Sequence, residues 1–333
     1  MKLIFLLSGE NAGLAKAEVL SLAAAFGKIM GYEADDRILL LEFRGENFFH
    51  RLALSHEASE FISSCPYEEL KAEFEKISLT GSCCVRASGI GVKVDPDLER
   101  RLGAVLWRKG LRIDLTEPDN LVRVYITRKR CYIGLLRFRQ EKKQFRDRLP
   151  NRRPFFMPVV ILPKLSRAIV NLTSLKSGLV LDPMCGTGSF LIEAGLMGLE
   201  ICGMDYYRDI VEGCRKNLEF FNLDGEVLQG DARAIPFKDR SFDAVVTDYP
   251  YFRATRSGTE NDLYARSLEE IYRVLKNGKR AVIVTNLDLK WLPGRLILKA
   301  EQRVHKSLTR RIYVIEKTDF EPRSAQQSLQ QVS

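Results

Sequence analysis

The second half of the chain alternates apolar runs with stretches whose apolar residues recur at helical spacing. Segments 242–246 (FDAVV) and 281–284 (AVIV) are almost wholly apolar, whereas 263–278 repeats apolar residues every three or four positions. Nearly continuous apolar strands separated by helices are typical of a parallel sheet covered on both faces. We therefore predict strands within 178–184, 199–205, 225–232, 241–250 and 279–286, and helices within 189–198, 208–222 and 263–278.

Two further apolar segments, 295–304 and 309–317, are separated by only a few residues. Such a short connection cannot hold the crossover that parallel strands require. We therefore predict an antiparallel pair at the edge of the sheet. The residues after Glu321 are rich in Gln and Ser, and we expect them to be disordered.

The first half mixes strand and helix patterns without the same regular rhythm. The pattern predicts a hairpin over 121–136 that turns near residues 128–130. It also predicts strands within 2–9, 37–43, 82–90 and 111–115, and helices within 13–27, 49–62, 68–77 and 97–110. The prolines 150, 154 and 158 then interrupt the chain and mark a linker over 141–158.

Composition narrows the class of protein. No apolar run reaches the length of a membrane span, and the short apolar N-terminus lacks the cleavage pattern of an export signal. None of the seven cysteines is spaced as C-x-x-C, and the three histidines are scattered, so we predict no metal site. We expect a reduced, cytoplasmic protein with no membrane association.

The net charge of +9 is concentrated in one segment. Residues 128–153 contain eleven Lys and Arg against two acids, a surplus that equals the charge of the whole chain. A run of charges is often only a solvated face, but here aromatic residues interleave with the basic ones, which suits phosphate contacts with base stacking beside them. We therefore predict an RNA-binding surface that includes Arg128, Lys129, Arg130, Lys142, Lys143, Arg146, Arg152 and Arg153.

A glycine-rich turn, Asp182-Pro-Met-Cys-Gly-Thr-Gly188, joins a predicted strand to a helix. Glycines let the backbone turn tightly and approach a ligand, and ligands of such sheets bind beyond the carboxyl ends of the strands. The absence of a phosphate-binding lysine argues against a nucleoside triphosphate. Asp205, Asp231 and Asp248 end the following strands, and acids there suit hydroxyl groups, an amino group or a cation.

These motifs resemble the S-adenosylmethionine-binding motifs of class I methyltransferases, over roughly residues 160–317. The resemblance implies that Gly186 and Gly188 let the cofactor lie against the loop and that Asp205 holds the ribose hydroxyls. It further implies that Asp231 and Ala232 face the adenine and that Asp182 holds the methionine end. The predicted cofactor-binding set is Asp182, Met184, Gly186, Thr187, Gly188, Asp205, Tyr206, Asp231 and Ala232.

The motif TDYPY (247–251) resembles the [D/N]-x-P-[Y/F] motif of methyltransferases that modify exocyclic amino groups of bases. Tyr249 stands where proline is common, and we expect both tyrosine rings of the motif to be exposed. The resemblance assigns catalytic roles to Asp248, Pro250 and Tyr251. Acceptors at Asp248 and near Pro250 would bind both N–H groups of an extruded base, and Tyr251 would stack on it.

The order of domains narrows the family. Segments 83–89 (CCVRASG) and 113–135 resemble a THUMP RNA-binding domain, and the arrangement resembles archaeal THUMP-domain tRNA guanosine N2-methyltransferases that act at position 10. The implied fold is an α+β ferredoxin-like region and a THUMP domain, followed by a class I (Rossmann-like) domain with a seven-stranded, mostly parallel sheet. The predicted ranges are 1–55 for the N-terminal domain, 56–140 for THUMP, 141–158 for the linker, 159–320 for the methyltransferase domain and 321–333 for the tail.

The resemblance implies transfer of methyl groups from S-adenosylmethionine to N2 of a guanosine in tRNA, with dimethylation expected. One alternative is N2 methylation of another guanosine, in the acceptor stem or in ribosomal RNA. Another is an RNA-binding protein with an inactive methyltransferase domain, which the intact glycines and acids disfavour. Thiolation enzymes and deaminases also carry THUMP domains, but the chain has neither an S-G-G-x-D-S loop nor a Cys/His zinc set.

Overall fold

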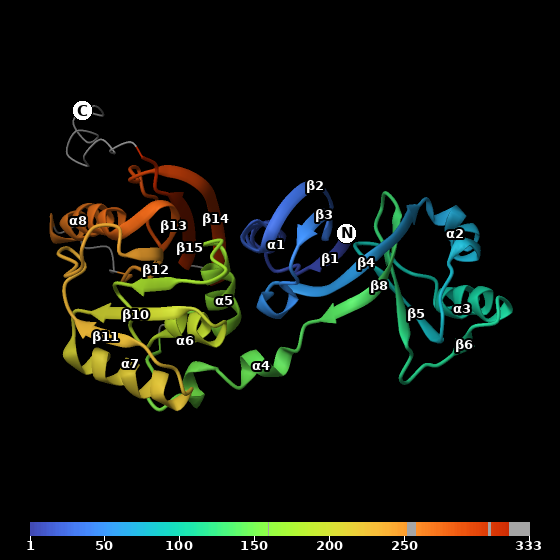
Figure 1. Cartoon of the computed structure of the whole chain (residues 1–333), viewed down its shortest axis with the longest axis horizontal. Coiled ribbons are helices and arrows are strands. Elements are labelled where there is room, and N and C mark those ends of the chain that lie inside the picture. Colours follow the sequence, from blue (N-terminus) through green and yellow to red (C-terminus); the bar gives the residue numbers. More distant parts are fainter. Residues whose placement is uncertain (159, 252–257, 306–307, 320–333) are drawn as a thin grey trace. The chain divides into compact units, whose positions relative to one another are not determined.

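The computed structural model describes residues 1–158, 160–251, 258–305 and 308–319 (Figure 1). It divides into two compact units, Met1–Gln140 and Glu141–Ser333, each built on one sheet. All seven cysteines are buried free thiols. Among the described helices, none is long and apolar enough to cross a membrane. The predicted tail lies outside the described residues.

The first unit contains an eight-stranded sheet in the order β2-β3-β1-β4-β8-β7-β5-β6. Its strands are β1 (Lys2–Leu7), β2 (Gly27–Asp35), β3 (Ile38–Gly45), β4 (Ser55–Cys65), β5 (Ser82–Gly89), β6 (Arg112–Ile113), β7 (Asn120–Ile126) and β8 (Cys131–Arg139). Its helices are α1 (Ala12–Phe26), α2 (Leu70–Lys76) and α3 (Leu98–Arg108). The predicted hairpin is confirmed as β7 and β8, which pair antiparallel.

The prediction of a helix over 49–62 is wrong. Only Phe49–Arg51 forms a short 3-10 turn, and Ser55–Cys65 is strand β4. This strand pairs with β1 on one side and β8 on the other, so tertiary pairing satisfies its backbone groups and overrides the local helical spacing. The predicted boundary at residue 55 falls at the start of this strand, and one sheet continues across it. The unpredicted β2 is mostly exposed and pairs only with β3.

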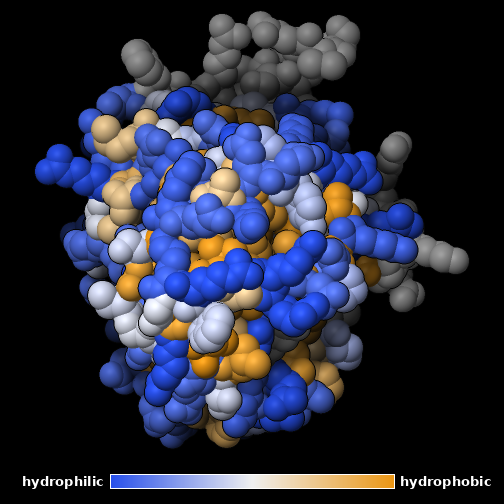
Figure 2. Space-filling view, turned by 90° about the vertical axis from the view of Figure 1, so that its right-hand side faces the viewer, coloured by the Kyte–Doolittle hydropathy of each residue, from blue (hydrophilic) through white to orange (hydrophobic). Residues whose placement is uncertain are grey.

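The surface of the first unit is mainly hydrophilic on the face that carries α2 and α3. Figure 2 shows this face, where hydrophilic side chains surround a smaller group of hydrophobic ones near the centre. Helix α3 on this face is amphipathic. Its residues Leu98, Leu102 and Leu106 are buried, whereas its charged side chains face the surface.

The second unit contains a seven-stranded sheet in the order β11-β10-β9-β12-β13-β15-β14. Its strands are β9 (Leu179–Asp182), β10 (Glu200–Asp205), β11 (Glu226–Gln229), β12 (Phe242–Asp248), β13 (Leu275–Thr285), β14 (Arg295–His305) and β15 (Leu308–Glu316). Its helices are α4 (Lys142–Arg146), α5 (Pro163–Asn171), α6 (Ser189–Leu196), α7 (Arg208–Phe220) and α8 (Gly258–Val274). The elements predicted from 178 to 317 are therefore confirmed, except that residues 275–278, predicted as the end of a helix, begin strand β13.

The sheet of the second unit is mixed rather than mostly parallel, which corrects the prediction. β9 to β13 pair in parallel, but β15 pairs antiparallel with both β13 and β14. The short connection between β14 and β15 forces them into a hairpin, as predicted, and the later strand of that hairpin inserts next to β13. The first residues of β15 consequently lie at the same edge as the carboxyl end of β13, with Thr285 opposite Arg311.

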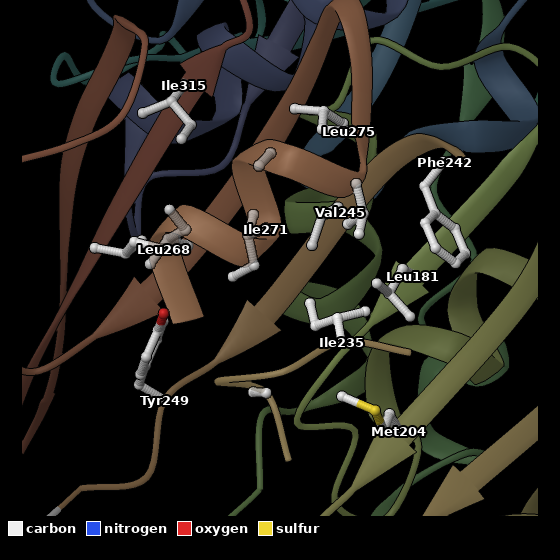
Figure 3. Close-up of a cluster of buried hydrophobic side chains, with 14 of the residues drawn as sticks. Leu181, Met204, Ile235, Phe242, Val245, Tyr249, Leu268, Ile271, Leu275 and Ile315 are labelled. Carbon is white, nitrogen blue, oxygen red and sulfur yellow. The ribbon is translucent and has the colours of Figure 1, made fainter. Parts of the chain in front are cut away.

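The core of this unit packs between the sheet and α8 (Figure 3). Leu181, Val245, Ile271 and Ile315 come from β9, β12, α8 and β15, and all four are fully buried. Burial of apolar side chains on central strands stabilises the packing of helices against such a sheet. The rigid core fixes the carboxyl ends of the strands, which carry the predicted acids.

Candidate active site

One cavity of about 620 Å³ lies at the carboxyl ends of β9, β10, β11 and β12. Asp182, Asp205, Asp231 and Asp248, the four acids at the strand ends, all line it. The other residues predicted for cofactor and base also line it, apart from Gly188: they are Met184, Gly186, Thr187, Tyr206, Ala232, Pro250 and Tyr251. This edge of a parallel sheet is where ligands of such folds bind.

The loop between β9 and α6 owes its shape to two glycines. Gly186 and Gly188 have φ angles of 52° and 82°, in the left-handed region that other residues rarely adopt. The Gly186 amide donates a hydrogen bond to Asp205 Oδ2 at 3.0 Å. At Gly188, which precedes α6, a Cβ atom would lie 2.8 Å from Cys214 Sγ. Gly188 therefore shapes the loop without lining the cavity.

The carboxyl groups crowd together in a way that favours a positively charged ligand. Burial, together with the charges of Asp205 and Asp248, raises the pKa of Asp182 well above its usual range. Burial also raises the pKa of Asp205, although its oxygens accept hydrogen bonds from the amides of Gly186 and Tyr207. A cation in this cavity would relieve the repulsion and stabilise the ionised forms. A sulfonium or ammonium group fits this charge pattern.

Thr187 offers a second sign of a ligand. Its side chain is only 3% exposed, and its Oγ1 has no hydrogen-bond partner among the described atoms. Buried hydroxyl groups are nearly always satisfied in folded proteins. Because Thr187 lines the cavity, a polar group of a bound ligand is the natural partner for this oxygen.

Arg233 also belongs to the site, although it was not predicted from the sequence. Its guanidinium donates to Asp231 Oδ2 at 2.6 Å and to Asp262 at 3.2 Å, and it lines the cavity. The Arg233 side chain lowers the pKa of Asp231, so this carboxylate stays ionised and fixed in place. The only sequence signal was an arginine two positions after the strand-end acid.

The expectation that both tyrosine rings of TDYPY are exposed is wrong, because Tyr251 is partly buried and Tyr249 is fully buried. The Tyr249 side chain is 1% exposed and belongs to the core (Figure 3). Its ring stacks on Tyr264 with centroids 4.2 Å apart, and its hydroxyl shares a 2.6 Å hydrogen bond with Ser267. Consecutive residues of a strand point to opposite sides, so Asp248 can face the ligand only if Tyr249 turns toward α8.

We expect Tyr249→Phe to lower the free energy of unfolding of the second unit by about 1 kcal/mol, because it removes one buried hydrogen bond and no ring packing. The two tryptophans, Trp107 and Trp291, lie in different units. Urea unfolding followed by Trp291 fluorescence in a Trp107→Phe background would report on the second unit alone. If Tyr249 instead handled the base through its hydroxyl, the variant would lose activity and keep its stability.

Asp248 and Tyr251 form a direct pair. The Tyr251 hydroxyl donates to Asp248 Oδ1 at 2.6 Å. Burial raises the pKa of Asp248 to about 7, and the bond from Tyr251 opposes that rise. Within the described residues, the second oxygen of Asp248 has no hydrogen-bond donor. One oxygen is therefore held while the other is available to a ligand N–H group.

Most of the predicted RNA-binding residues are exposed. Arg128, Lys129 and Arg130 lie on the turn between β7 and β8, and Lys143, Arg146 and Arg152 lie in the segment after residue 140. The Lys142 side chain lies outside the described part of the chain. Arg153 needs correction, because it is 6% exposed and its guanidinium donates to Ser189 and to the Arg148 carbonyl. It cannot contact a phosphate in this conformation.

A buried ion cluster includes Arg148, whose carbonyl accepts the hydrogen bond from Arg153. Glu193 on α6 is fully buried and accepts hydrogen bonds from Arg148 at 2.7 Å and from Arg167 at 2.8 Å. Both guanidinium groups also lie over the ring of Phe145. This arginine clamp, made of Arg148, Arg167 and Glu193, ties the segment after residue 140 and α5 to the helix that follows the glycine loop.

Comparisons with known proteins agree with this architecture. Residues 150–309 match the family model described as the RMKL-like methyltransferase domain. The crystal structure of TrmN from Thermus thermophilus superposes with a TM-score of 0.54 at 21% identity, covering 95% of this chain and 100% of that one. This second likeness supports the fold alone.

Two curated relatives share more of the sequence. The tRNA (guanine(10)-N2)-dimethyltransferase of Pyrococcus abyssi is 35% identical over 323 residues, which cover 91% of this chain and 96% of the relative. The protein of the same name from Methanothermobacter thermautotrophicus is 35% identical over 339 residues, which cover 95% of this chain and all of the relative.

Proposed function

The chain belongs to the tRNA (guanine(10)-N2)-dimethyltransferase family, and from this premise we propose that it methylates the exocyclic N2 amino group of a guanosine in tRNA, at position 10. The proposal rests mainly on the cavity, which is lined by both the glycine loop and Asp248. One carboxylate oxygen of Asp248 accepts a hydrogen bond from Tyr251, and the other is available to a substrate. Transfer of two methyl groups to the same nitrogen is part of the proposal.

The cavity fits S-adenosylmethionine in charge and in polar groups. We assign the methionine end to Asp182, the ribose hydroxyls to Asp205, and the adenine to Asp231 and Ala232. Thr187 Oγ1 would gain the partner that it lacks. When bound, this cofactor supplies a methyl group on a positively charged sulfur, which keeps the electron pair of the bond that breaks.

Asp248 prepares the amine. A guanine N2 group is a poor nucleophile because its lone pair is delocalised into the ring. An N–H donated to Asp248 Oδ2, and a second N–H accepted by a backbone carbonyl near Pro250, would draw the nitrogen toward tetrahedral geometry and free that pair. After the new N–C bond forms, the surplus proton passes from nitrogen to the carboxylate. Alignment of the amine in the cavity supplies the remaining advantage.

The experiment is methylation of unmodified tRNA transcripts with isotope-labelled S-adenosylmethionine, followed by mass spectrometry of the nucleosides. We expect N2-methylguanosine first and N2,N2-dimethylguanosine later, and cleavage mapping should place both at position 10. A methylated guanosine elsewhere would keep the chemistry and change the target. Binding of RNA without any methyl transfer would leave only the RNA-binding alternative.

The exposed basic residues provide a separate prediction for RNA binding. Lys143→Gln combined with Arg146→Gln should weaken tRNA binding at low salt. The slope of log affinity against log salt should fall by about 0.7–0.9 for each phosphate contact removed. Arg208→Gln combined with Lys290→Gln removes the same charge from exposed residues outside the basic segment and should leave the slope unchanged. Equal slopes for the two double variants would show that the basic segment after residue 140 only connects the domains and does not bind RNA.

A further inference from the structure

We propose that Arg310 is a positioning residue for methyl transfer, which acts through Tyr251 to fix the orientation of the Asp248 carboxylate toward the substrate amine. The inference rests on the proposed function. It concerns a residue on the antiparallel strand β15, outside every motif that the sequence analysis singled out.

The three side chains form a directed chain of hydrogen bonds. Arg310 Nε donates to the Tyr251 hydroxyl oxygen at 2.8 Å, and the guanidinium carbon lies 5.7 Å from the centre of the Tyr251 ring. A guanidinium has donors and no acceptor, so the phenol oxygen must accept. The single proton of the phenol then has one direction left, toward Asp248 Oδ1 at 2.6 Å. Arg310 thus sets the polarity of the whole chain.

This polarity decides what Asp248 presents to the cavity. Oδ1 is occupied by the Tyr251 proton, so Oδ2 is the oxygen that can accept an N–H from the amine. Without Arg310 the phenol could rotate its proton away, and the carboxylate would lose the contact that fixes its χ2 angle. The acceptor would remain in the cavity, but its direction would no longer be defined.

The topology of the sheet explains how a distant residue reaches this position. Arg310 and Tyr251 are 59 residues apart in sequence. β15 runs antiparallel to β13, so its first residues lie at the carboxyl ends of the parallel strands. Arg310 is 7% exposed, and a buried cation requires a compensating charge. Asp248 supplies that charge through the intervening phenol.

If Arg310 acts on Asp248 as proposed, its substitution should change the pKa of Asp248, which a purely structural role would leave unchanged. The groups that face Asp248 are Tyr251 in the following loop, Arg310 on β15 and Asp182 on β9. Burial raises the pKa of Asp248 to about 7, while the Tyr251 bond and the Arg310 charge lower it. Burial and the Asp248 charge also raise the pKa of Tyr251, so it remains a neutral donor.

The direction of the pH dependence follows from the proposal that Asp248 must be ionised to accept the N–H. A protonated Asp248 is a poor acceptor, so kcat/KM should rise with pH and level off above a midpoint near 7. Loss of the Arg310 charge removes an influence that lowers this pKa. The midpoint of Arg310→Gln should therefore move to higher pH, by about one unit.

The test compares pH profiles of N2-methylguanosine formation by the full chain acting on tRNA transcripts. Arg310→Gln should show the raised midpoint and about a tenfold lower plateau in kcat, with an unchanged KM for the cofactor. Arg310→Lys keeps the charge and should return the midpoint toward that of the wild type, with only partial recovery of kcat. Arg311→Gln is the matched control, because Arg311 contacts the Asn286 carbonyl and Glu301 instead, and its profile should equal that of the wild type.

A second measurement separates this inference from the proposed function. The Asp248 carboxyl carbon can be titrated by ¹³C NMR without RNA, with Asp248→Asn to assign the signal, and Arg310→Gln should raise its pKa. A wild-type protein that forms no N2-methylguanosine would refute the proposed function but leave this titration as a test of the Arg310 contact. Unchanged profiles and an unchanged titration would overturn the inference. If Arg310→Gln does not fold, Tyr251→Phe breaks the same link and must raise the midpoint, and an unchanged midpoint there overturns the inference as well.

Discussion

Asp248→Ala should lower kcat for methyl transfer to guanosine by about 10²- to 10³-fold, the range seen when one preorganised group that stabilises a transition state is removed. The substitution deletes the oxygen proposed to accept an N–H of the amine, and no other carboxylate lies at the end of β12. It also frees the hydroxyl of Tyr251, which loses its acceptor. The cofactor contacts assigned to Asp205 and Asp231 stay in place, so cofactor binding should persist.

Single-turnover methylation of a tRNA transcript measures the loss in rate, and calorimetric titration with S-adenosylmethionine checks that the cavity remains intact. Asp248→Asn keeps the shape of the side chain but replaces one acceptor oxygen by a donor, so it should be impaired nearly as much. Asp224→Ala, at an exposed position outside the cavity, is the matched control and should behave as the wild type. Full activity of Asp248→Ala would show that this carboxylate does not handle the base.

Glu193→Gln should destabilise the second unit by about 3–5 kcal/mol, the range for breaking a buried ion pair on one side. Glu193 is fully buried and is the acid between Arg148 and Arg167. Glutamine fills the same space but brings no negative charge, so the buried Arg167 and the partly buried Arg148 lose their counter-charge. The effect exceeds that of losing one hydrogen bond, because uncompensated charges remain in a medium of low polarity.

The measurement is urea unfolding followed by Trp291 fluorescence in the Trp107→Phe background, so that the transition of the second unit is read separately. Glu212→Gln is the matched control, since Glu212 forms an exposed ion pair with Arg208, four residues away on α7. Such surface pairs contribute little to stability, so this variant should unfold like the wild type. Equal midpoints for the two glutamine variants would show that the arginine clamp does not stabilise the fold.

Contacts outside the arginine clamp also connect the segment after residue 140 to the glycine loop and to the start of α6. Asn217 on α7 donates to the carbonyls of Phe155 and Thr187, and its Oδ1 accepts from the Phe155 amide. Arg153 donates to Ser189 at the start of α6. Residues that the sequence groups with the basic linker are thus part of the support for the glycine loop. Residue spacing alone gives no sign of this, because each partner lies on a different element.

Strand and helix patterns were informative where burial is complete. Segments 242–246 and 281–284 are central strands, apolar on both faces, and their patterns were correct. The pattern failed for β4, whose partners β1 and β8 lie far away in sequence, and it missed β2, which has few apolar residues and one neighbour. The spacing of apolar residues reflects only the local segment. Strand pairing depends on segments that are distant in the sequence, so local spacing cannot predict it.

The residues that line the cavity could largely be predicted from the sequence. Parallel strands must end at one edge, so the acids at 182, 205, 231 and 248 had to meet there around the glycine loop. The neighbours of these residues, by contrast, could not be predicted, because they depend on how distant segments pack. The tertiary structure turned Tyr249 into the core, buried Arg153 beside α6, and brought Arg310 to Tyr251 by inserting β15 next to β13. The reason is physical: the order of residues along a strand fixes the face to which each side chain points, whereas contacts between strands and helices arise only when the whole core packs.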